Sequence, residues 1–212
     1  MKHAASRELY AYWEAKRGTR PAPERAEIEP GAIRGILSDT FILALDRGLG
    51  HPVRLAGTRV CALFDREIKG ESFLGLWAAD SRPVVDSLIA ILAEECIGTV
   101  AAATAQDNAG QPIDLELLLL PLGAGRPHFA RAIGVLAPLT PRPWLGPFCP
   151  LSLGGRRHVG AALENRLLPR FMAPRTRRGL IVYEGGRARQ GDADEGSAAA
   201  SSLAPRDLHQ RH

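Results

Sequence analysis

The sequence predicts an α+β fold, with a five-stranded antiparallel sheet, helices packed on one of its faces and an N-terminal helical extension. Three observations lead to this class. Short apolar runs are joined by segments rich in Gly, Pro, Asp and Asn, which are typical of hairpin turns. The clearest helical pattern, residues 80–95, separates two early strands from three later ones. Because turns, and not crossover helices, join most consecutive strands, the sheet is expected to be antiparallel.

The N-terminal extension is predicted to be helical. Residues 6–17 place Leu9 and Trp13 on one helical face, and Ser6 is the expected N-cap. A short helical turn follows in "EIEPGAIRGIL", where Pro30 stands near the start and lacks only an amide that a helix start leaves unused. We expect the Leu9/Trp13 face to pack on the domain or to build a homodimer.

A hairpin and a helical segment come next. Residues 41–46 and 53–57 are short apolar runs on either side of the turn "RGLGHP", and Leu55 is expected on the inner face of the sheet. Residues 58–70 have a helical apolar spacing. Gly70 is expected to end this segment, since glycine tolerates a positive φ.

The second half of the domain begins with the long helix, residues 80–95, for which Asp80 is the expected cap. Its predicted buried face is Val84, Leu88, Ile91 and Leu92.

Three further strands are predicted at residues 98–106, 113–122 and 128–139. The middle one alternates, so Asp114 and Glu116 should face outward. The inward residues of this strand are then Leu115, Leu117 and Leu119.

A cluster of prolines between residues 138 and 150 marks the predicted domain boundary. The expected Pro/Arg-rich extension beyond it carries a short amphipathic helix from Val159 and a strand at 179–186. The complete division is an N-terminal helical extension at 1–40, the domain at 41–140, this extension at 141–187 and a disordered tail at 188–212.

The charge is uneven along the 212 residues. The net charge is +4, yet residues 41–138 hold 8 basic against 11 acidic side chains, whereas residues 139–178 hold 8 arginines against one glutamate. The basic character therefore belongs to the C-terminal extension and not to the domain.

The cysteine pattern and the apolar runs bear on location. Cys61, Cys96 and Cys149 are widely spaced and odd in number, which favours neither a disulfide framework nor a zinc site. The N-terminal stretch lacks the apolar core of a secretory signal, and no apolar run is long enough to span a membrane. We expect a cytoplasmic protein.

One stretch, "RLAGTRVCALFDREIKGESFLGLW" at 54–77, raises the question of a catalytic or phosphate-binding loop. Gly57 and Gly70 are too far apart for such a loop, and no Lys-Ser/Thr pair follows a glycine. The segment "AGTRV" lacks the serine of a nucleophile elbow. The histidines have no metal-ligand spacing. We therefore expect no catalytic residue, no metal site and no enzyme.

The predicted strands and helices around this stretch follow a recognisable order. The order strand, strand, helix, glycine, long helix and three strands resembles the PAS sensory fold. Within it, "RLAGTRVCALFDREIKGESFLGLW" is similar to a bacterial PAS-like family of short proteins formerly described as a domain of unknown function. The N-terminal "LYAYWEAKRGTRPAPERAEIEPGAI" and the late "VYEGG" add to the match, which covers residues 7–140 with a weaker extension to 187.

The resemblance implies a five-stranded sheet with helices on one face and a small cavity between them. PAS domains sense small ligands, carry cofactors or mediate dimerisation. Flavin photosensors of this fold carry a reactive cysteine just after the glycine that precedes the long helix, but "GESFLGLW" has none. Haem sensors of the fold often use a histidine on the long helix, and residues 80–95 contain none. The cofactor is therefore unknown, with neither signature present.

Five residues are candidates for ligand binding in that cavity: Arg59, Cys61, Phe64, Trp77 and Leu117. Trp77 could stack on a flat ligand or anchor a connector to the core. Arg59 could bind an anionic group, or it could be solvated or paired with an acidic neighbour, Asp65 or Glu67. Cys61 could contact a ligand or fill the core as a small apolar residue.

The resemblance and the residues leave three functions open. The first is a non-enzymatic sensory or regulatory protein in bacterial signalling, which acts through small-ligand sensing and protein partners. The second is a dimerisation or interaction module without a ligand. The third is a basic arm for nucleic acid or an anionic membrane surface, formed by Arg156, Arg157, Arg166, Arg170, Arg175, Arg177 and Arg178.

Overall fold

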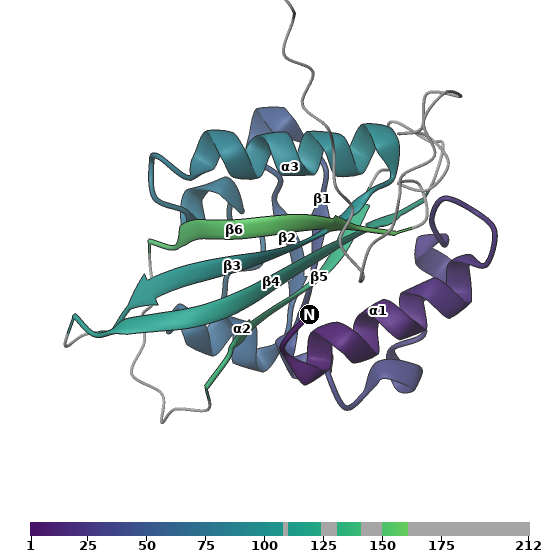
Figure 1. Cartoon of the computed structure of the whole chain (residues 1–212), viewed down its shortest axis with the longest axis horizontal. Helices are drawn as coiled ribbons and strands as arrows, with labels where there is room; N and C mark the ends of the chain where they lie inside the picture. The colour runs from purple at the N-terminus through teal and green to yellow at the C-terminus, as the bar shows by residue number, and fades with distance from the viewer. Residues whose placement is uncertain (108–109, 124–130, 141–149, 161–212) are drawn as a thin grey trace, which may run out of the picture. The chain divides into compact units, whose positions relative to one another are not determined.

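The computed structural model describes residues 1–107, 110–123, 131–140 and 150–160 (Figure 1). The helices are α1 (Ala4–Arg17), α2 (Thr58–Leu63) and α3 (Arg82–Glu95), with short 3₁₀ turns η1 (Arg25–Glu27), η2 (Pro30–Ile33), η3 (Leu37–Asp39), η4 (Arg47–Leu49) and η5 (Leu74–Leu76). The strands are β1 (Thr40–Ala44), β2 (Val53–Ala56), β3 (Gly98–Gln106), β4 (Pro112–Leu122), β5 (Arg131–Pro138) and β6 (Ser152–Val159). The strand predicted at 179–186, the tail at 188–212 and most of the helix predicted from Val159 lie outside the described residues.

The strands form one sheet in the order β2-β1-β5-β4-β3-β6, and every neighbouring pair is antiparallel. The predicted fold class is confirmed, but the sheet has a sixth strand. β6 pairs with β3, so Val159 ends a strand where a helix was predicted to begin. The apolar spacing behind that prediction continues into residues the structure does not describe. Within β6 the pairing register shifts opposite Ala102, where Gly154 comes close to the neighbouring strand.

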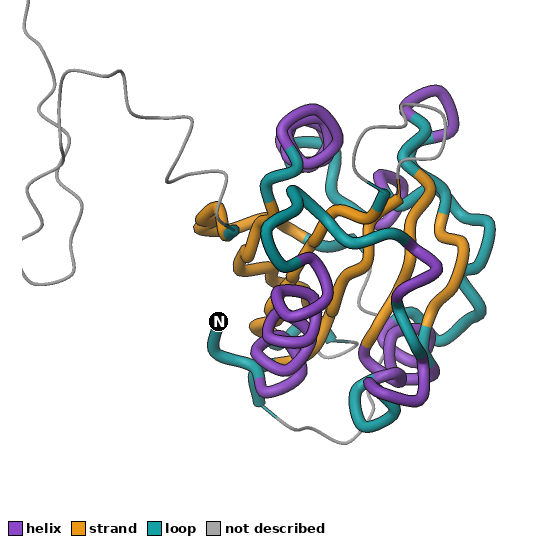
Figure 2. Tube along the Cα trace, turned by 90° about the vertical axis from the view of Figure 1, so that its right-hand side faces the viewer, coloured by secondary structure: helices purple, strands orange, loops and turns teal. Residues whose placement is uncertain are grey.

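Helices and turns lie on both sides of the sheet (Figure 2), and apolar side chains are buried on both of its faces. α2, α3 and η5 cover one face, as predicted for the domain. α1 and the turns η2 and η3 cover the other face. We call these layers the α3-side core and the α1-side core. β4 is buried on both sides because Leu117 and Leu119 enter the first core and Leu118 and Leu120 the second.

The N-terminal helix packs on its own domain, one of the two arrangements predicted for its apolar face. Leu9 and Trp13 are fully buried, and the Trp13 indole nitrogen donates to the Pro121 carbonyl of β4 at 2.8 Å. The predicted cap is wrong, however. α1 begins at Ala4, and His3 is the N-cap, since its ring nitrogen Nδ1 accepts from the Ala5 amide. Ser6 lies inside the helix and is buried.

The two helices of the α3 side are shorter than predicted. α2 ends at Leu63, and a left-handed Asp65 turns the chain, although Gly70 does have the predicted positive φ. α3 begins at Arg82, after Ser81 and not Asp80. Its buried face is Val85, Leu88, Ile89 and Leu92, so Val84 and Ile91 were placed wrongly. The four buried residues have i, i+3, i+4, i+7 spacing, so the buried face is centred one position away from the predicted one.

Two residues of the sheet differ from their predicted environments. Leu55 was expected on the inner face, but β2 is an edge strand and 44% of Leu55 remains exposed. Glu116 was expected outward in solvent, but it is only 5% exposed because the N-terminal segment covers it.

Candidate functional site

Four of the five predicted ligand residues meet in the α3-side core. Phe64, Trp77 and Leu117 are fully buried in this layer, and Cys61 of α2 packs against it from the side. Their elements are the end of α2, the segment before α3 and the centre of β4. This is the layer between sheet and helices in which the sequence predicted a ligand.

Trp77 lies at the centre of a chain of aromatic rings. The Phe73 ring meets it edge-on, with centroids 5.9 Å apart and planes at 67°, and Phe41 stacks on Phe73 at 5.4 Å. The indole nitrogen of Trp77 is buried and has no hydrogen-bond partner among the described residues. A buried N–H without an acceptor is costly, by about 1–3 kcal/mol, so this donor calls for an acceptor that the described chain does not supply.

The backbone around Trp77 joins three elements. Its carbonyl accepts from Nε of Arg82, the first residue of α3, at 2.8 Å. On the other side, the Ala78 amide donates to the Leu151 carbonyl at 2.8 Å, and the Leu151 amide donates back to Leu76 at 2.9 Å. Leu151 directly precedes β6. A displacement of Trp77 therefore acts on both α3 and the edge strand β6.

Arg59 does not join this cluster. Its guanidinium pairs with the buried carboxylate of Asp39 at 2.9 Å, and not with the neighbours Asp65 or Glu67. The partner Asp39 lies in η3, 20 residues earlier, so the sequence close to Arg59 could not have identified it.

The surroundings of Cys61 disfavour its thiolate form. Burial raises the pKa of its thiol, and Glu67, whose carboxylate lies 3.5 Å from the sulfur, raises it further. The contact with the core agrees with the interpretation of Cys61 as a small apolar residue.

A polar link that sequence reasoning missed ties the first hairpin to α3. Nε2 of buried His51 lies 3.1 Å from one carboxylate oxygen of Asp86, and Arg47 binds the other at 2.6 Å. The His51 hydrogen bond lowers the pKa of Asp86, burial opposes this, and Arg47 lowers it further. His51 has a left-handed backbone conformation (φ 59°), which is uncommon for a residue other than glycine. This backbone angle marks the residue in the structure, but the sequence alone does not reveal it.

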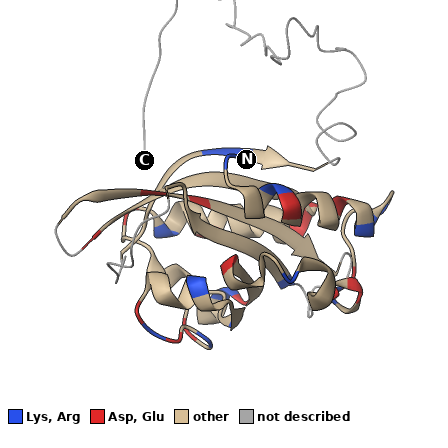
Figure 3. Ribbon diagram, turned by 90° about the horizontal axis from the view of Figure 1, so that it is seen from below, with Lys and Arg blue, Asp and Glu red and all other residues tan. Residues whose placement is uncertain are grey.

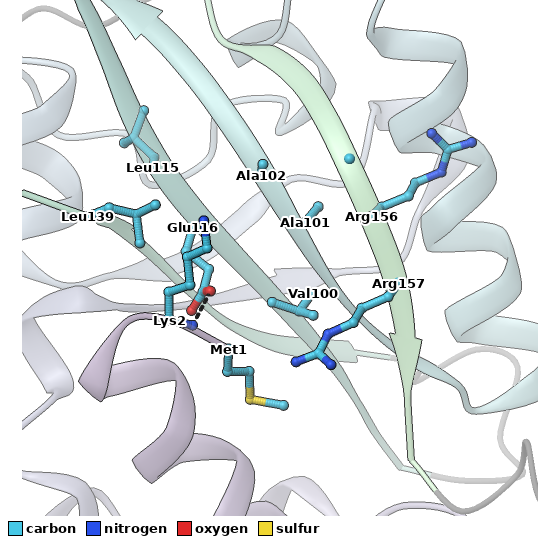
Figure 4. A pocket seen from close by; sticks show the side chains of 11 residues that line it. Met1, Lys2, Val100, Ala101, Ala102, Leu115, Glu116, Leu139, Arg156 and Arg157 are labelled. Atoms are coloured by element: carbon cyan, nitrogen blue, oxygen red, sulfur yellow. Dashed lines mark hydrogen bonds between the residues drawn. The ribbon is translucent and has the colours of Figure 1, made fainter. Parts of the chain in front are cut away.

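A separate pocket of about 440 Å³ lies on the α1-side face, between the N-terminal segment and β6 (Figure 4). Val100 and Ala102 contribute to its apolar floor, and Glu116 binds the backbone of Lys2 beside it. The Arg157 side chain extends toward Met1, whereas Arg156 points away toward the opposite face (Figure 4). Sequence reasoning did not bring these residues together, since the pocket requires the sixth strand.

β6 carries a concentration of positive charge at the edge of the sheet (Figure 3). Arg156 and Arg157 are exposed, and the strand contains no acidic residue. The other five arginines of the predicted basic arm lie outside the described residues.

Comparison with known proteins gives one family. The sequence model of the PAS domain family matches residues 1–137. No significant match was found among curated proteins.

Solved structures of similar fold have low identity to this chain. A light-oxygen-voltage domain studied with a flavin analogue is 14% identical, with a TM-score of 0.41, over 52% of this chain and 83% of that one. The LOV protein of Rhodobacter sphaeroides is 18% identical, with a TM-score of 0.39, over 50% of this chain and 64% of that one. The PAS domain of an HTR-like protein from Haloarcula marismortui is 13% identical, with a TM-score of 0.38, over 51% of this chain and 89% of that one.

None of the helices in the described part of the chain is long and apolar enough to cross a membrane. No group of three or more His, Cys, Asp or Glu side chains in those segments could hold a metal ion.

Proposed function

The chain belongs to the PAS domain family, and from that membership we propose that it is a non-enzymatic sensory or regulatory protein of bacterial signalling. In this proposal a small ligand binds in the α3-side core, and the result is transmitted to protein partners or to a second copy of the chain. We place this activity in the cytoplasm, where a reducing environment suits a thiol such as Cys61 that forms no disulfide.

The indole N–H of Trp77, which has no acceptor within the described part of the chain, is the observation that carries the proposal. It is a hydrogen-bond donor in an otherwise apolar, aromatic layer. A small ligand with a carbonyl or another acceptor atom would satisfy it and stack against the rings of Phe73 and Trp77. Water is also an acceptor, and the mass of the bound species distinguishes an organic ligand from a buried water.

Transmission follows from the connections of Trp77. A ligand that binds one position of the indole better than another shifts the population toward that position. The contacts of Trp77 with Arg82 and of its neighbours with Leu151 then link that shift to α3 and to β6. The exposed arginines of β6 offer partner proteins a surface that changes with the core.

A second candidate, an interaction module without a ligand, is favoured by the packing of the same layer. Phe41, Phe64, Phe73, Trp77 and Leu117 are each at most 2% exposed. A core filled by its own side chains leaves less need for a ligand. In that case dimerisation or partner binding at the sheet would be the whole function.

Native mass spectrometry of the untagged protein, purified from its own host, distinguishes the two. Additional mass that is lost on denaturation supports the sensor, and an unliganded mass favours the interaction module. The same spectrum reports the number of copies of the chain.

The variant Trp77→Phe tests the assigned donor, because phenylalanine keeps an aromatic ring and removes the N–H. Its matched control is Trp13→Phe, which alters the indole that already donates to Pro121. We expect Trp77→Phe to lose the additional mass and Trp13→Phe to keep it. Equal occupancy in both variants would refute the role of Trp77.

A further inference from the structure

Besides the pocket at the N-terminal segment, a second cavity lies on the α1-side face of the sheet, opposite the face that Trp77 covers. It has a volume of about 370 Å³ and lies between the turns η1–η3 and the edge formed by β1 and β2. This volume is within the range of roughly 300–1,000 Å³ typical of small-molecule sites. The site lies outside the α3-side core, so an inference about it does not depend on the function proposed for that core.

The walls of this cavity are apolar. Ile28 and Ile33 come from the N-terminal turns, Ile42 and Ile133 from the sheet, and Leu55 from the edge strand. Leu55 is 44% exposed, and the only other large apolar side chain so exposed in the described segments is Leu49 of the hairpin turn. An apolar occupant would remove the exposed surface of Leu55 from water, which is favourable.

The backbone holds one wall in place. A Cβ atom at Gly57 would lie 2.1 Å from the carbonyl oxygen of Leu37, so β2 and η3 approach closer than any side chain would allow. The Gly57 amide donates to the Thr40 carbonyl at 2.8 Å. This wall of the cavity is therefore held in place by backbone contacts before any ligand arrives, which reduces the cost of binding.

One positive charge lies at the rim. Arg25 lines the cavity and is exposed, and its guanidinium forms no hydrogen bond or ion pair within the described part of the chain. Its acidic neighbour Glu27 is already paired with Arg20 at 2.8 Å. Ser38 and Thr58 add hydroxyl groups to the lining. A planar guanidinium with free donors matches a carboxylate in a bidentate contact.

We propose that this cavity binds an amphipathic monocarboxylate of the medium-chain fatty acid class. The alkyl chain lies against Ile28, Ile33 and Leu55, and the carboxylate binds Arg25 at the rim. The apolar walls call for an alkyl chain, and the one cation in the described lining, which has no partner among the described residues, calls for a single negative charge. Because the walls come from both the N-terminal turns and the sheet, the bound ligand would hold the N-terminal extension against the domain.

Decanoate, kept below its micelle-forming concentration, is the probe, and isothermal titration calorimetry with a thermal melt is the readout. We expect saturable binding and a raised melting temperature. Decanol should bind more weakly and the decyltrimethylammonium cation more weakly still. Absence of saturable decanoate binding, or equal binding of the cation, would overturn the proposal.

Matched variants test the two contacts. Arg25→Gln should weaken decanoate binding by about tenfold, since it removes a charge-assisted hydrogen bond. Arg34→Gln, which alters an exposed arginine directly after η2 that does not line the cavity, should not. Leu55→Gln should weaken binding by a similar factor, and Leu49→Gln should leave it unchanged. All four side chains are exposed, so the variants should fold.

Light scattering resolves the competing occupant. If a second copy of the chain covers the cavity, Leu55→Gln will lower the molar mass in solution, and decanoate will compete with association. We expect the molar mass to be the same for the wild type, Leu55→Gln and Leu49→Gln. A fall in mass confined to Leu55→Gln would replace the fatty acid with a dimer interface.

Discussion

The carboxylate of Glu116, in the middle of β4, accepts a hydrogen bond from the Lys2 backbone amide at 2.6 Å. A second oxygen accepts from the His3 amide at 3.0 Å, directly before α1 begins. A negative charge at this place also interacts favourably with the N-terminal end of the helix dipole. This one buried side chain fixes the point where the N-terminal extension meets the sheet. Burial opposes its ionisation, but the Lys2 and His3 amides lower the pKa of Glu116.

We expect Glu116→Gln to loosen α1. A neutral amide accepts more weakly than a carboxylate, so the free energy of unfolding should fall by about 1–3 kcal/mol. Hydrogen exchange of the α1 amides should become faster, measured by mass spectrometry. Asp114→Asn, which alters an exposed carboxylate two residues earlier on the same face, is the control and should change neither quantity.

The contribution of Glu116 to the free energy of unfolding should also depend on pH. A carboxyl group whose pKa is lowered by folding stabilises the protein above its unfolded pKa, and this contribution is lost as the pH falls through its folded value. The difference in stability between wild type and Glu116→Gln should therefore be present at neutral pH and shrink as the pH falls below about 4. A difference that stays constant from pH 7 to pH 3 would contradict a charged Glu116.

The Glu116 contact also explains what sequence could and could not predict. Alternation along β4 placed Glu116 on the correct face, and the Leu9/Trp13 pattern predicted a helix that could pack on the domain. That the two meet is a contact between residues more than 100 positions apart, which local periodicity does not contain. The antiparallel sheet and the long helix were predicted from patterns of a few residues. The predicted bounds of most helices and strands lie within two residues of the observed bounds.

Two physical causes, a weak local pattern and a distant partner, explain the main misses. β6 has a weak apolar pattern, since one of its faces is exposed at the sheet edge and Gly154 and Gly155 interrupt it. The partner of His51 is 35 residues away on α3. Whether the predicted residues Phe64, Trp77 and Leu117 bind a ligand stays a prediction, because their joint burial suits both a ligand site and a packed core.

The link from His51 to Asp86 should contribute to stability. Asp86→Asn removes the charge that both His51 and Arg47 bind, and we expect a loss of about 1–3 kcal/mol in the free energy of unfolding, measured in urea. Since folding lowers the pKa of Asp86, its contribution should be complete above about pH 4 and should disappear as the pH falls further. Glu94→Gln, on an exposed position of the same helix, should show no comparable loss.

Cys61 should react slowly with alkylating reagents. Its raised pKa leaves little thiolate at neutral pH, so iodoacetamide labelling, followed by peptide mapping, should speed up only at strongly alkaline pH. Glu67→Gln removes one cause of the raised pKa and should accelerate labelling at pH 8. The conservative variant Glu67→Asp should react at the wild-type rate or close to it. No acceleration in Glu67→Gln would mean that burial alone controls the thiol.

Gly134 of β5 should be intolerant of any side chain. A Cβ atom there would lie 2.4 Å from Cζ of Phe41 and 2.5 Å from the Leu118 carbonyl oxygen, and the second of these is backbone that cannot rotate away. We expect Gly134→Ala to lower the free energy of unfolding by about 1–3 kcal/mol through overpacking. Gly155→Ala is the control, because a Cβ atom at that strand position meets nothing within 4 Å.

The same variant tests whether strain in the sheet reaches the proposed sensing layer. Phe41 stacks on Phe73, which in turn meets Trp77, so a displaced Phe41 ring should change the environment of the indole. We expect the near-ultraviolet circular dichroism of Gly134→Ala to differ from that of the wild type, and Gly155→Ala to match it. A destabilised Gly134→Ala protein with an unaltered aromatic signal would separate the sheet from Trp77 and would weaken the proposed route of transmission.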